Sequence, residues 1–249
     1  SLLAAGSLSI FNFARQLYAL PVSLFGVALA QASFPTLAAE AAHSDLTKFK
    51  HTLAKSLSQI FFFALPASIL VLILRIPLVR LAFGARTFPW EATLLTGRSL
   101  AFLALSIAPL AVTQVLVRAF HALKDTRRPL YVGAVTMVVF TLSAVYASRS
   151  AGYGVLGITA AMSLSNYLDF LFLYLLLRRR IGTLSLTWRL TKMVIASAAT
   201  AFALWLPLRL LDQFVFDTTR TLPLIVLTLI VSLVGFLVYL VFCKILLIE

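Results

Sequence analysis

Seven long stretches without charged residues alternate with short basic loops between Arg15 and Glu249. These charge-free runs cover 16–39, 56–74, 99–117, 129–148, 150–168, 193–208 and 221–243. A helix needs roughly 20 predominantly apolar residues to cross the hydrocarbon core of a bilayer. Flanking Lys and Arg side chains can extend the shorter runs by reaching toward the membrane surface. The pattern therefore predicts an all-α polytopic membrane protein with about seven transmembrane helices.

Composition agrees with this prediction and excludes a soluble fold. Hydrophobic residues make up 61% of the chain and charged residues only 12%, which would leave a soluble protein with far too much exposed apolar surface. The net charge of +13 is spread over the short loops rather than gathered in one patch or arm. We therefore expect the charge to set topology, and we expect no nucleic-acid partner.

The basic residues divide unequally between the two sides of the membrane. Thirteen follow the odd-numbered spans, namely Lys48, Lys50, Lys55, Arg118, Lys124, Arg127, Arg128, Arg178, Arg179, Arg180, Arg189, Lys192 and Lys244. Seven follow the even-numbered spans, namely Arg75, Arg80, Arg86, Arg98, Arg149, Arg209 and Arg220. The positive-inside rule then places the first set and the C-terminus in the cytoplasm and Ser1 outside.

The first residues and the single cysteine bear on the extent of the protein. The chain begins with Ser1, and neither a signal peptide nor a cytoplasmic segment precedes the first span. We therefore expect the chain to be the C-terminal piece of a larger protein. Cys243 has no second cysteine to pair with, so it is interpreted as a packing residue, with lipidation as the alternative.

The first span carries a polar stripe. Ser9, Asn12, Gln16 and Ser23 are separated by three, four and seven residues, which places them on one helix face with Arg15 at its edge. Such groups either bond to neighbouring helices or line a cavity. An Arg inside a span faces a wet cavity or a partner charge, unless it reaches the outer surface. Pro21 near the middle predicts a bend.

Polar residues also mark the second and third spans and the segment that joins them. Residues 75–91, with three Pro or Gly breakers, predict the most elaborate loop on the outer side. In the third span, Ser106 lies seven residues from both Ser99 and Thr113 on one face, and Pro109 predicts a second kink.

The fifth span contains Ser163, Asn166 and Asp169 at three-residue steps. Asp169 is the only acidic residue within any predicted span, so it either pairs with a cation or titrates. Arg15 is the only cation that the predicted spans offer, although a helix outside this chain is an equally open partner.

The chain lacks the residues that an intramembrane enzyme needs. It has no HExxH, no GxSxG and no acid pair at ligand spacing. His43, His51 and His121 fall in predicted loops or at helix ends. We therefore expect no catalysis, no metal and no cofactor, and the bent helices with polar faces favour transport.

Three ordered strings resemble one known family. They are GSLSIFNFARQLYALPVSLFGVALAQASFPTLAAE at 6–40, FGARTFPWEAT at 83–93 and RAFHALKDTRRP at 118–129. Together they resemble the MurJ (MviN) family of lipid II flippases, within the multidrug/oligosaccharidyl-lipid/polysaccharide exporter (MOP) superfamily. The last two spans agree with that family by position and hydropathy alone.

The resemblance implies a fold of fourteen helices in two lobes, with this chain as helices eight to fourteen of a bacterial cytoplasmic membrane protein. Residues 1–181 would form the lobe core, whose five spans line half of the central cavity. Residues 182–249 would add two helices that form a groove for lipid tails. The implied activity is transport of lipid II by alternating access, with the substrate, membrane lipids and the missing N-terminal lobe as partners.

The candidate site residues, taken from the polar positions and the resemblance together, fall in two groups, and the resemblance implies no role for Asp169. The substrate cavity would include Asn12, Arg15, Gln16, Ser23, Ser106, Asn166 and Asp169. The cytoplasmic loop motif would include Arg118, Lys124, Asp125, Arg127 and Arg128. Many family members carry an essential Arg where this chain has Gln16, one position after Arg15, and one residue rotates a helical side chain by about 100°.

That departure keeps several interpretations open. Arg15 reaches the same cavity from an adjacent angle, or this chain handles the head group differently. Alternative functions are a flippase for another undecaprenyl-linked glycan, a multidrug exporter of the same superfamily, or a non-transporting membrane scaffold.

Overall fold

The computed structural model describes residues 6–84, 88–149, 153–184, 187–214 and 221–246. Within these ranges the regular elements are all helices. In chain order they are α1 (Ser7–Pro21), the π-helix η1 (Val22–Val27), α2 (Ala28–Ala42), α3 (Leu46–Ile73), α4 (Arg75–Phe83), α5 (Trp90–Leu105), α6 (Ile107–Ala122), α7 (Arg127–Arg149), α8 (Gly154–Ile181), α9 (Thr187–Phe214) and α10 (Thr221–Ile245).

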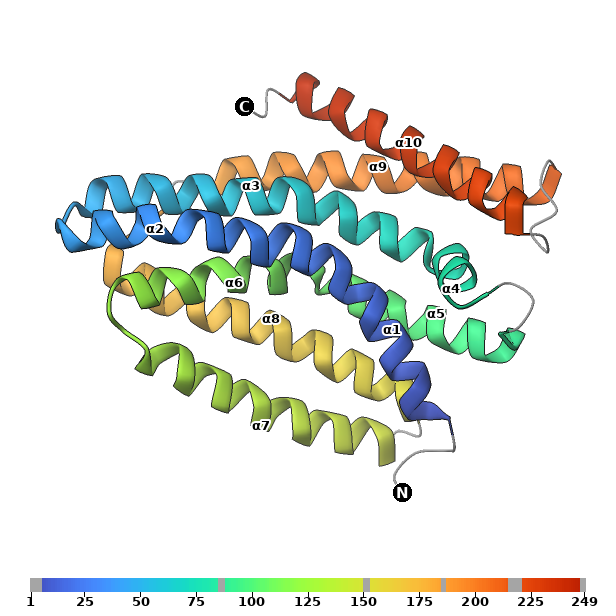
Figure 1. The fold of residues 1–249 in the computed structure, drawn as a ribbon, viewed down its shortest axis with the longest axis horizontal. Coiled ribbons are helices and arrows are strands. Elements are labelled where there is room, and N and C mark those ends of the chain that lie inside the picture. The colour runs from blue at the N-terminus through green and yellow to red at the C-terminus, as the bar shows by residue number, and fades with distance from the viewer. Residues whose placement is uncertain (1–5, 85–87, 150–152, 185–186, 215–220, 247–249) are drawn as a thin grey trace.

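The long helices run back and forth along one bundle, with the N- and C-termini at opposite ends (Figure 1). Five are long and apolar enough to cross a membrane, counting Ser7–Ala42 as one continuous helix, and the α5–α6 pair bent by 45° gives a sixth. The remaining pass is α9, whose described apolar part is Leu190–Leu204. The prediction of an all-α polytopic membrane protein is confirmed, and its count of about seven is approximate.

The first span bends where the sequence predicts it. Pro21 has no N–H to donate to the carbonyl four residues earlier, and its ring crowds that turn. The chain responds with a single stretch of π-helix, Val22–Val27, before the α-helix resumes. Figure 1 shows the direction of the helix changing between α1 and α2.

The segment predicted as an elaborate outer loop is partly helical, so that prediction is wrong for its first half. Residues Arg75–Phe83 form α4. Pro77 occupies an early helical position, where a missing N–H costs little. Val79 is fully buried and supplies the apolar contact that holds the short helix on the bundle. Helix α5 then begins at Trp90, nine residues before the charge-free run 99–117.

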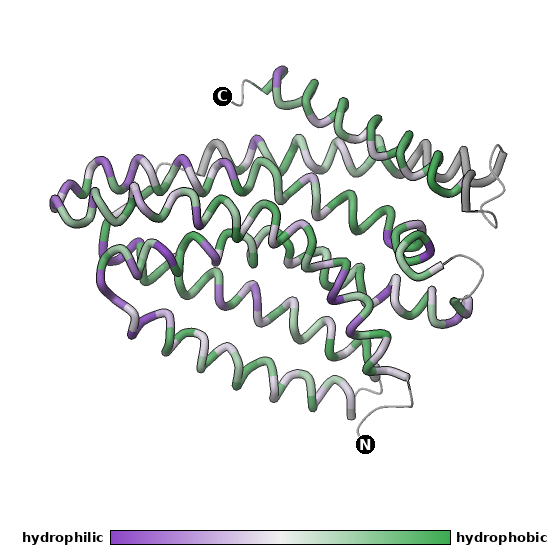
Figure 2. Tube along the Cα trace, viewed as in Figure 1, coloured by the Kyte–Doolittle hydropathy of each residue, from purple (hydrophilic) through white to green (hydrophobic). Residues whose placement is uncertain are grey.

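The core is divided between the two parts of the chain. One large cluster joins α1–α3, α5, α6 and α8, with Leu57, Leu103 and Phe120 almost wholly buried. Two smaller clusters join α9 and α10 to the side of α3, around Val231 and Tyr239. Figure 2 shows α10 as almost uniformly hydrophobic, with hydrophilic residues gathered toward the ends of the other helices.

Two glycines let helix backbones approach closely. A Cβ added at Gly26 would lie 2.7 Å from the Cα of Ala111 in α6, and one added at Gly157 would lie 2.8 Å from the Cβ of Ala147 in α7. Close backbone contact through small residues is a principal source of helix association in membranes. Gly26 therefore fixes the distance between the bent first span and α6.

We expect Gly26→Ala to destabilise the protein by about 1–3 kcal/mol, because the rigid backbone of α6 must move to admit the methyl group. The measurement is thermal unfolding of the purified protein in detergent. Gly133→Ala is the matched control, since a Cβ at this helical position in α7 meets nothing within 4 Å. An equal loss in both variants would contradict the packing explanation.

Candidate functional site

The polar stripe predicted on the first span lies on one exposed face of α1 and η1. Asn12, Arg15, Gln16 and Ser23 are all exposed, while Ala14 and Tyr18 on the other side of the helix are buried. Arg15 makes no ion pair or hydrogen bond within the described part of the chain. An unpaired Arg within an apolar span is costly against lipid, so this face requires water or another protein surface.

Other exposed helix faces are suited to lipid. On α10 the exposed residues include Leu229 at 64% and Leu233 at 60%, and on α7 they include Leu130 and Met137 at about 70%. The α1 face carries an Arg, two amides and hydroxyl groups where α10 carries aliphatic side chains. The exposed side of α1 and η1 is thus mixed, because these polar groups lie beside the exposed Leu8, Leu20 and Leu24.

Arg15 is not the only cation inside an apolar helix. Arg98, which the sequence analysis assigned to the outer loops, lies in the third turn of α5 and is exposed. The prediction failed because α5 begins several residues earlier than the charge-free run does.

Ser106 and Asn166 belong to a buried polar cluster, which we call the hub, together with Tyr18 and Ser163. The Asn166 side-chain amide donates to the Tyr18 hydroxyl at 2.8 Å and to Ser106 Oγ at 3.1 Å. Ser163 Oγ lies 3.3 Å from Ser106 Oγ. The hub joins α1, the α5–α6 break and α8 in the interior of the bundle. Sequence reasoning missed Tyr18, although a Tyr on the apolar side of an amphipathic helix requires a hydroxyl partner.

The third span breaks at Ser106, three residues before Pro109, where the sequence predicted a kink. The Ser106 N–H donates to the Leu103 carbonyl at 2.9 Å, one residue short of its helical partner, so the Phe102 carbonyl loses a donor. Ser163 Oγ donates to that carbonyl at 2.5 Å. The break is therefore held by a side chain of α8.

Asp169 lies against α7 and makes no ion pair with Arg15. It lies on α8 one turn after Ser165, whose Oγ donates to the Thr136 carbonyl of α7 at 2.8 Å. These contacts place Asp169 at the seam between α7 and α8, apart from the exposed α1 face.

The predicted loop motif forms the turn between α6 and α7. The N–H groups of Lys124 and Asp125 donate to the carbonyls of His121 and Phe120, which is the Schellman arrangement with Lys124 at the left-handed position, φ +56°. The Asp125 carboxylate accepts the Arg128 N–H at 3.3 Å and pairs with Arg180 of α8 at 2.6 Å. Arg118 stacks over Phe34 of α2 at 5.7 Å, and Arg127 is exposed.

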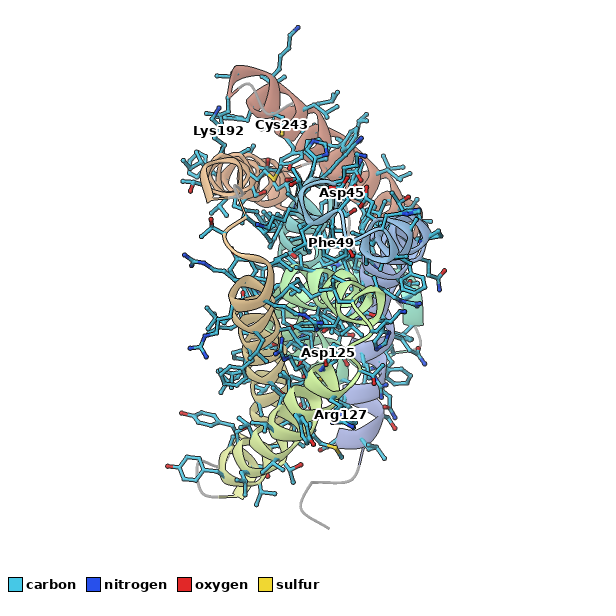
Figure 3. All side chains as sticks on the ribbon, turned by 90° about the vertical axis from the view of Figure 1, so that its left-hand side faces the viewer. Asp45, Phe49, Asp125, Arg127, Lys192 and Cys243 are labelled. Atoms are coloured by element: carbon cyan, nitrogen blue, oxygen red, sulfur yellow. The ribbon has the colours of Figure 1, made fainter. Side chains whose placement is uncertain are left out.

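The turn between α2 and α3 repeats this arrangement. Ser44 takes the left-handed position with φ +57°, and Asp45 accepts the Lys48 N–H at 3.0 Å and its ammonium group at 3.1 Å. The donated N–H holds the pKa of Asp45 below its ordinary value. Both turns lie at one end of the bundle, which faces the viewer in Figure 3, where Asp45 and Asp125 are labelled. We call it the basic end, since Lys48, Arg128 and Arg180 pair there with the acids of the two turns.

Comparisons with known proteins agree on one family. The family model described as "Lipid II flippase MurJ" matches residues 1–242. A "Probable lipid II flippase MurJ" of Rhizobium meliloti is 28% identical over 88% of this chain and 41% of that relative. A protein with the same description from Thermotoga maritima is 30% identical over 70% of this chain and 36% of its own length.

A solved structure shares the fold. The protein titled "Lipid II flippase MurJ, inward closed conformation" superposes with a TM-score of 0.75 at 23% identity, over 97% of this chain and 47% of that protein. The chain thus spans less than half of the length of the relatives that it matches.

We expect Asn166→Leu to destabilise the protein by about 1–2 kcal/mol, because it leaves the buried hydroxyls of Tyr18 and Ser106 without their amide donor. Thermal unfolding in detergent measures the loss. Gln59→Leu is the control, since Gln59 is an exposed amide on α3. If both substitutions had the same small effect, the hub would not contribute to stability.

We expect Asp125→Asn to destabilise the protein by about 1–2 kcal/mol, because the amide keeps a capping oxygen but loses its attraction to Arg180 and Arg128. Asp45→Asn should have a smaller effect, since its partner Lys48 is 75% exposed. Unfolding at low and high salt checks the assignment. Equal losses for the two variants would show that the link to Arg180 is unimportant.

Proposed function

The chain belongs to the lipid II flippase MurJ family, and on this basis we propose that it forms one lobe of a transporter that moves lipid II across the bacterial cytoplasmic membrane. The family match over residues 1–242 and the common fold support this function. Because the chain spans less than half of these relatives' length, the activity belongs to a larger protein. In this proposal a second, N-terminal lobe completes the cavity, and alternating access moves the substrate.

One observation carries the assignment of the substrate face. Arg15 is exposed on a polar helix face of a membrane protein and has no partner within the described residues. Lipid II has a pyrophosphate-linked sugar head group, and the planar guanidinium of Arg offers several donors to phosphate oxygens. We assign Asn12, Arg15, Gln16 and Ser23 to the wall that receives this head group.

The other predicted site residues take different roles in this proposal. Ser106 and Asn166 support the wall from behind, because they hold Tyr18 on the buried side of the same helix. Asp169 acts at the α7–α8 seam rather than at the substrate. The loop motif around Asp125 stabilises the basic end of the bundle.

The two parts of the chain have separate roles. Residues 1–181 form the lobe core that borders the cavity, and residues 182–249 add α9 and α10, which offer lipid tails an apolar path. The exposed aliphatic surface of α10 and its separate packing clusters on α3 support this division. The function is transport rather than catalysis.

Charge distribution supports the orientation. The turns after α2, α6 and α8 lie at the same end of the bundle in Figure 1. Because thirteen basic residues follow the odd-numbered passes and seven follow the even-numbered ones, the positive-inside rule places the basic end in the cytoplasm. The C-terminus is cytoplasmic in this orientation.

We expect the full-length protein that carries this chain to restore growth of bacteria depleted of their lipid II flippase. Arg15→Ala should abolish this rescue and Arg15→Lys should weaken it, because an ammonium group lacks the planar fork of guanidinium. Growth at matched membrane levels of each variant is the measurement.

Arg179→Ala is the control for loss of one positive charge, since Arg179 is exposed at the end of α8, outside the α1 face. Full rescue by Arg15→Ala would contradict the assignment of the substrate face. Failure of the unaltered protein to rescue would favour another undecaprenyl-linked glycan, a multidrug substrate or a scaffold role.

A further inference from the structure

Among the prolines of the described helices, Pro66 and Pro109 each remove a backbone donor within a membrane span. Pro66 lies within α3, and Pro109 lies just after the α5–α6 break. Because proline has no N–H, the carbonyl four residues earlier loses its helical hydrogen bond. The two carbonyls affected are those of Phe62 and Leu105.

Each of these two carbonyls is bonded by a tyrosine from another helix. The Tyr239 hydroxyl of α10 donates to the Phe62 carbonyl at 2.8 Å, and the Tyr167 hydroxyl of α8 donates to the Leu105 carbonyl at 2.8 Å. Since hydrocarbon offers no donor, a carbonyl freed within a span must be satisfied by the protein. The same solution thus occurs at two sites that are unrelated in sequence.

We propose that Tyr239 and Tyr167 are positioning residues whose hydroxyl groups replace the N–H that Pro66 and Pro109 lack. We call each contact a hydroxyl cap. The Tyr239 cap fixes the register of the α9–α10 pair on the lobe core, and the Tyr167 cap fixes α8 on the break in the third span. Each cap joins a proline-containing segment to a neighbouring helix, so the two move together.

The two caps differ in their surroundings. Tyr239 is 1% exposed and packs with Ala196 and Cys243, and its ring centroid lies 5.3 Å from that of Phe62. No water competes for its carbonyl in this apolar setting. Tyr167 is 45% exposed, so other donors can replace its hydroxyl in part. The Tyr239 cap should therefore have the larger effect.

The experiment is a double-mutant cycle on the full-length protein, followed by thermal unfolding in detergent. Tyr239→Phe should lower the Tm by about 1–4 °C. Pro66→Ala restores an N–H that can bond the Phe62 carbonyl, so Tyr239→Phe in that background should cost less than half as much. Tyr174→Phe, a stacked tyrosine on α8, should cost little and should not depend on residue 66.

Equal losses from Tyr239→Phe in the unaltered chain and in the Pro66→Ala variant would overturn the cap at Phe62, because a merely structural tyrosine is indifferent to that N–H. The cycle of Tyr167→Phe with Pro109→Ala tests the second cap in the same way, with a smaller expected shift. If Pro66→Ala does not fold, this second cycle still tests whether a tyrosine hydroxyl replaces the N–H that proline lacks.

A transport assay also tests the caps, and its interpretation rests on the proposed function. The unfolding experiment does not depend on that function, so the two can fail separately. In flippase-depleted cells, Tyr239→Phe should reduce rescue at matched protein levels, and Pro66→Ala in the same chain should restore part of it. If the unaltered protein does not rescue, the proposed function fails while the unfolding cycle still judges the caps. If rescue by Tyr239→Phe is complete, the cap has no part in transport.

Discussion

The need to satisfy every backbone carbonyl inside an apolar layer governs this structure. Straight helices meet that need by themselves, but this chain has a π-helical stretch after Pro21, Pro66 inside α3 and a bent break between α5 and α6 before Pro109. Each of these sites frees backbone groups where lipid supplies no donor. A π-helical stretch follows Pro21, and side-chain donors from neighbouring helices bond the carbonyls at the other two sites.

Under this constraint, the polar residues of the spans have different roles. Some polar side chains, such as Ser163 and Tyr239, bond freed carbonyls, and others, such as Asn166, bond hydroxyls of other helices. Both kinds face inward, and their hydrogen-bonding groups have partners within the fold. Arg15 remains exposed without such a partner among the described residues, so it is available to something outside this chain. The proposed substrate face therefore rests on the polar groups that the fold leaves without partners as well as on the chemistry of Arg15.

Side chains also bond backbone groups at the ends of the helices. Asp45 and Asp125 each lie between two helices, and each carboxylate accepts an N–H of the following helix. A non-glycine residue in the left-handed conformation, Ser44 or Lys124, comes just before each of them. Arg180 then ties the end of α8 to the second turn. At the basic end, Asp45 and Asp125 thus form ion pairs with a few of the cations.

The membrane class, the approximate number of spans, the bend at Pro21 and the polar stripe with Arg15 all follow from the order of the residues, because hydropathy and helical spacing are local properties. That order does not reveal that Ser106 and Asn166 meet Tyr18, that Asp169 faces α7 rather than Arg15, or that 75–83 is helical. Those outcomes depend on which faces of distant helices pack together. A proline shows where a carbonyl is freed, but the packing of the folded helices selects the hydroxyl that reaches it.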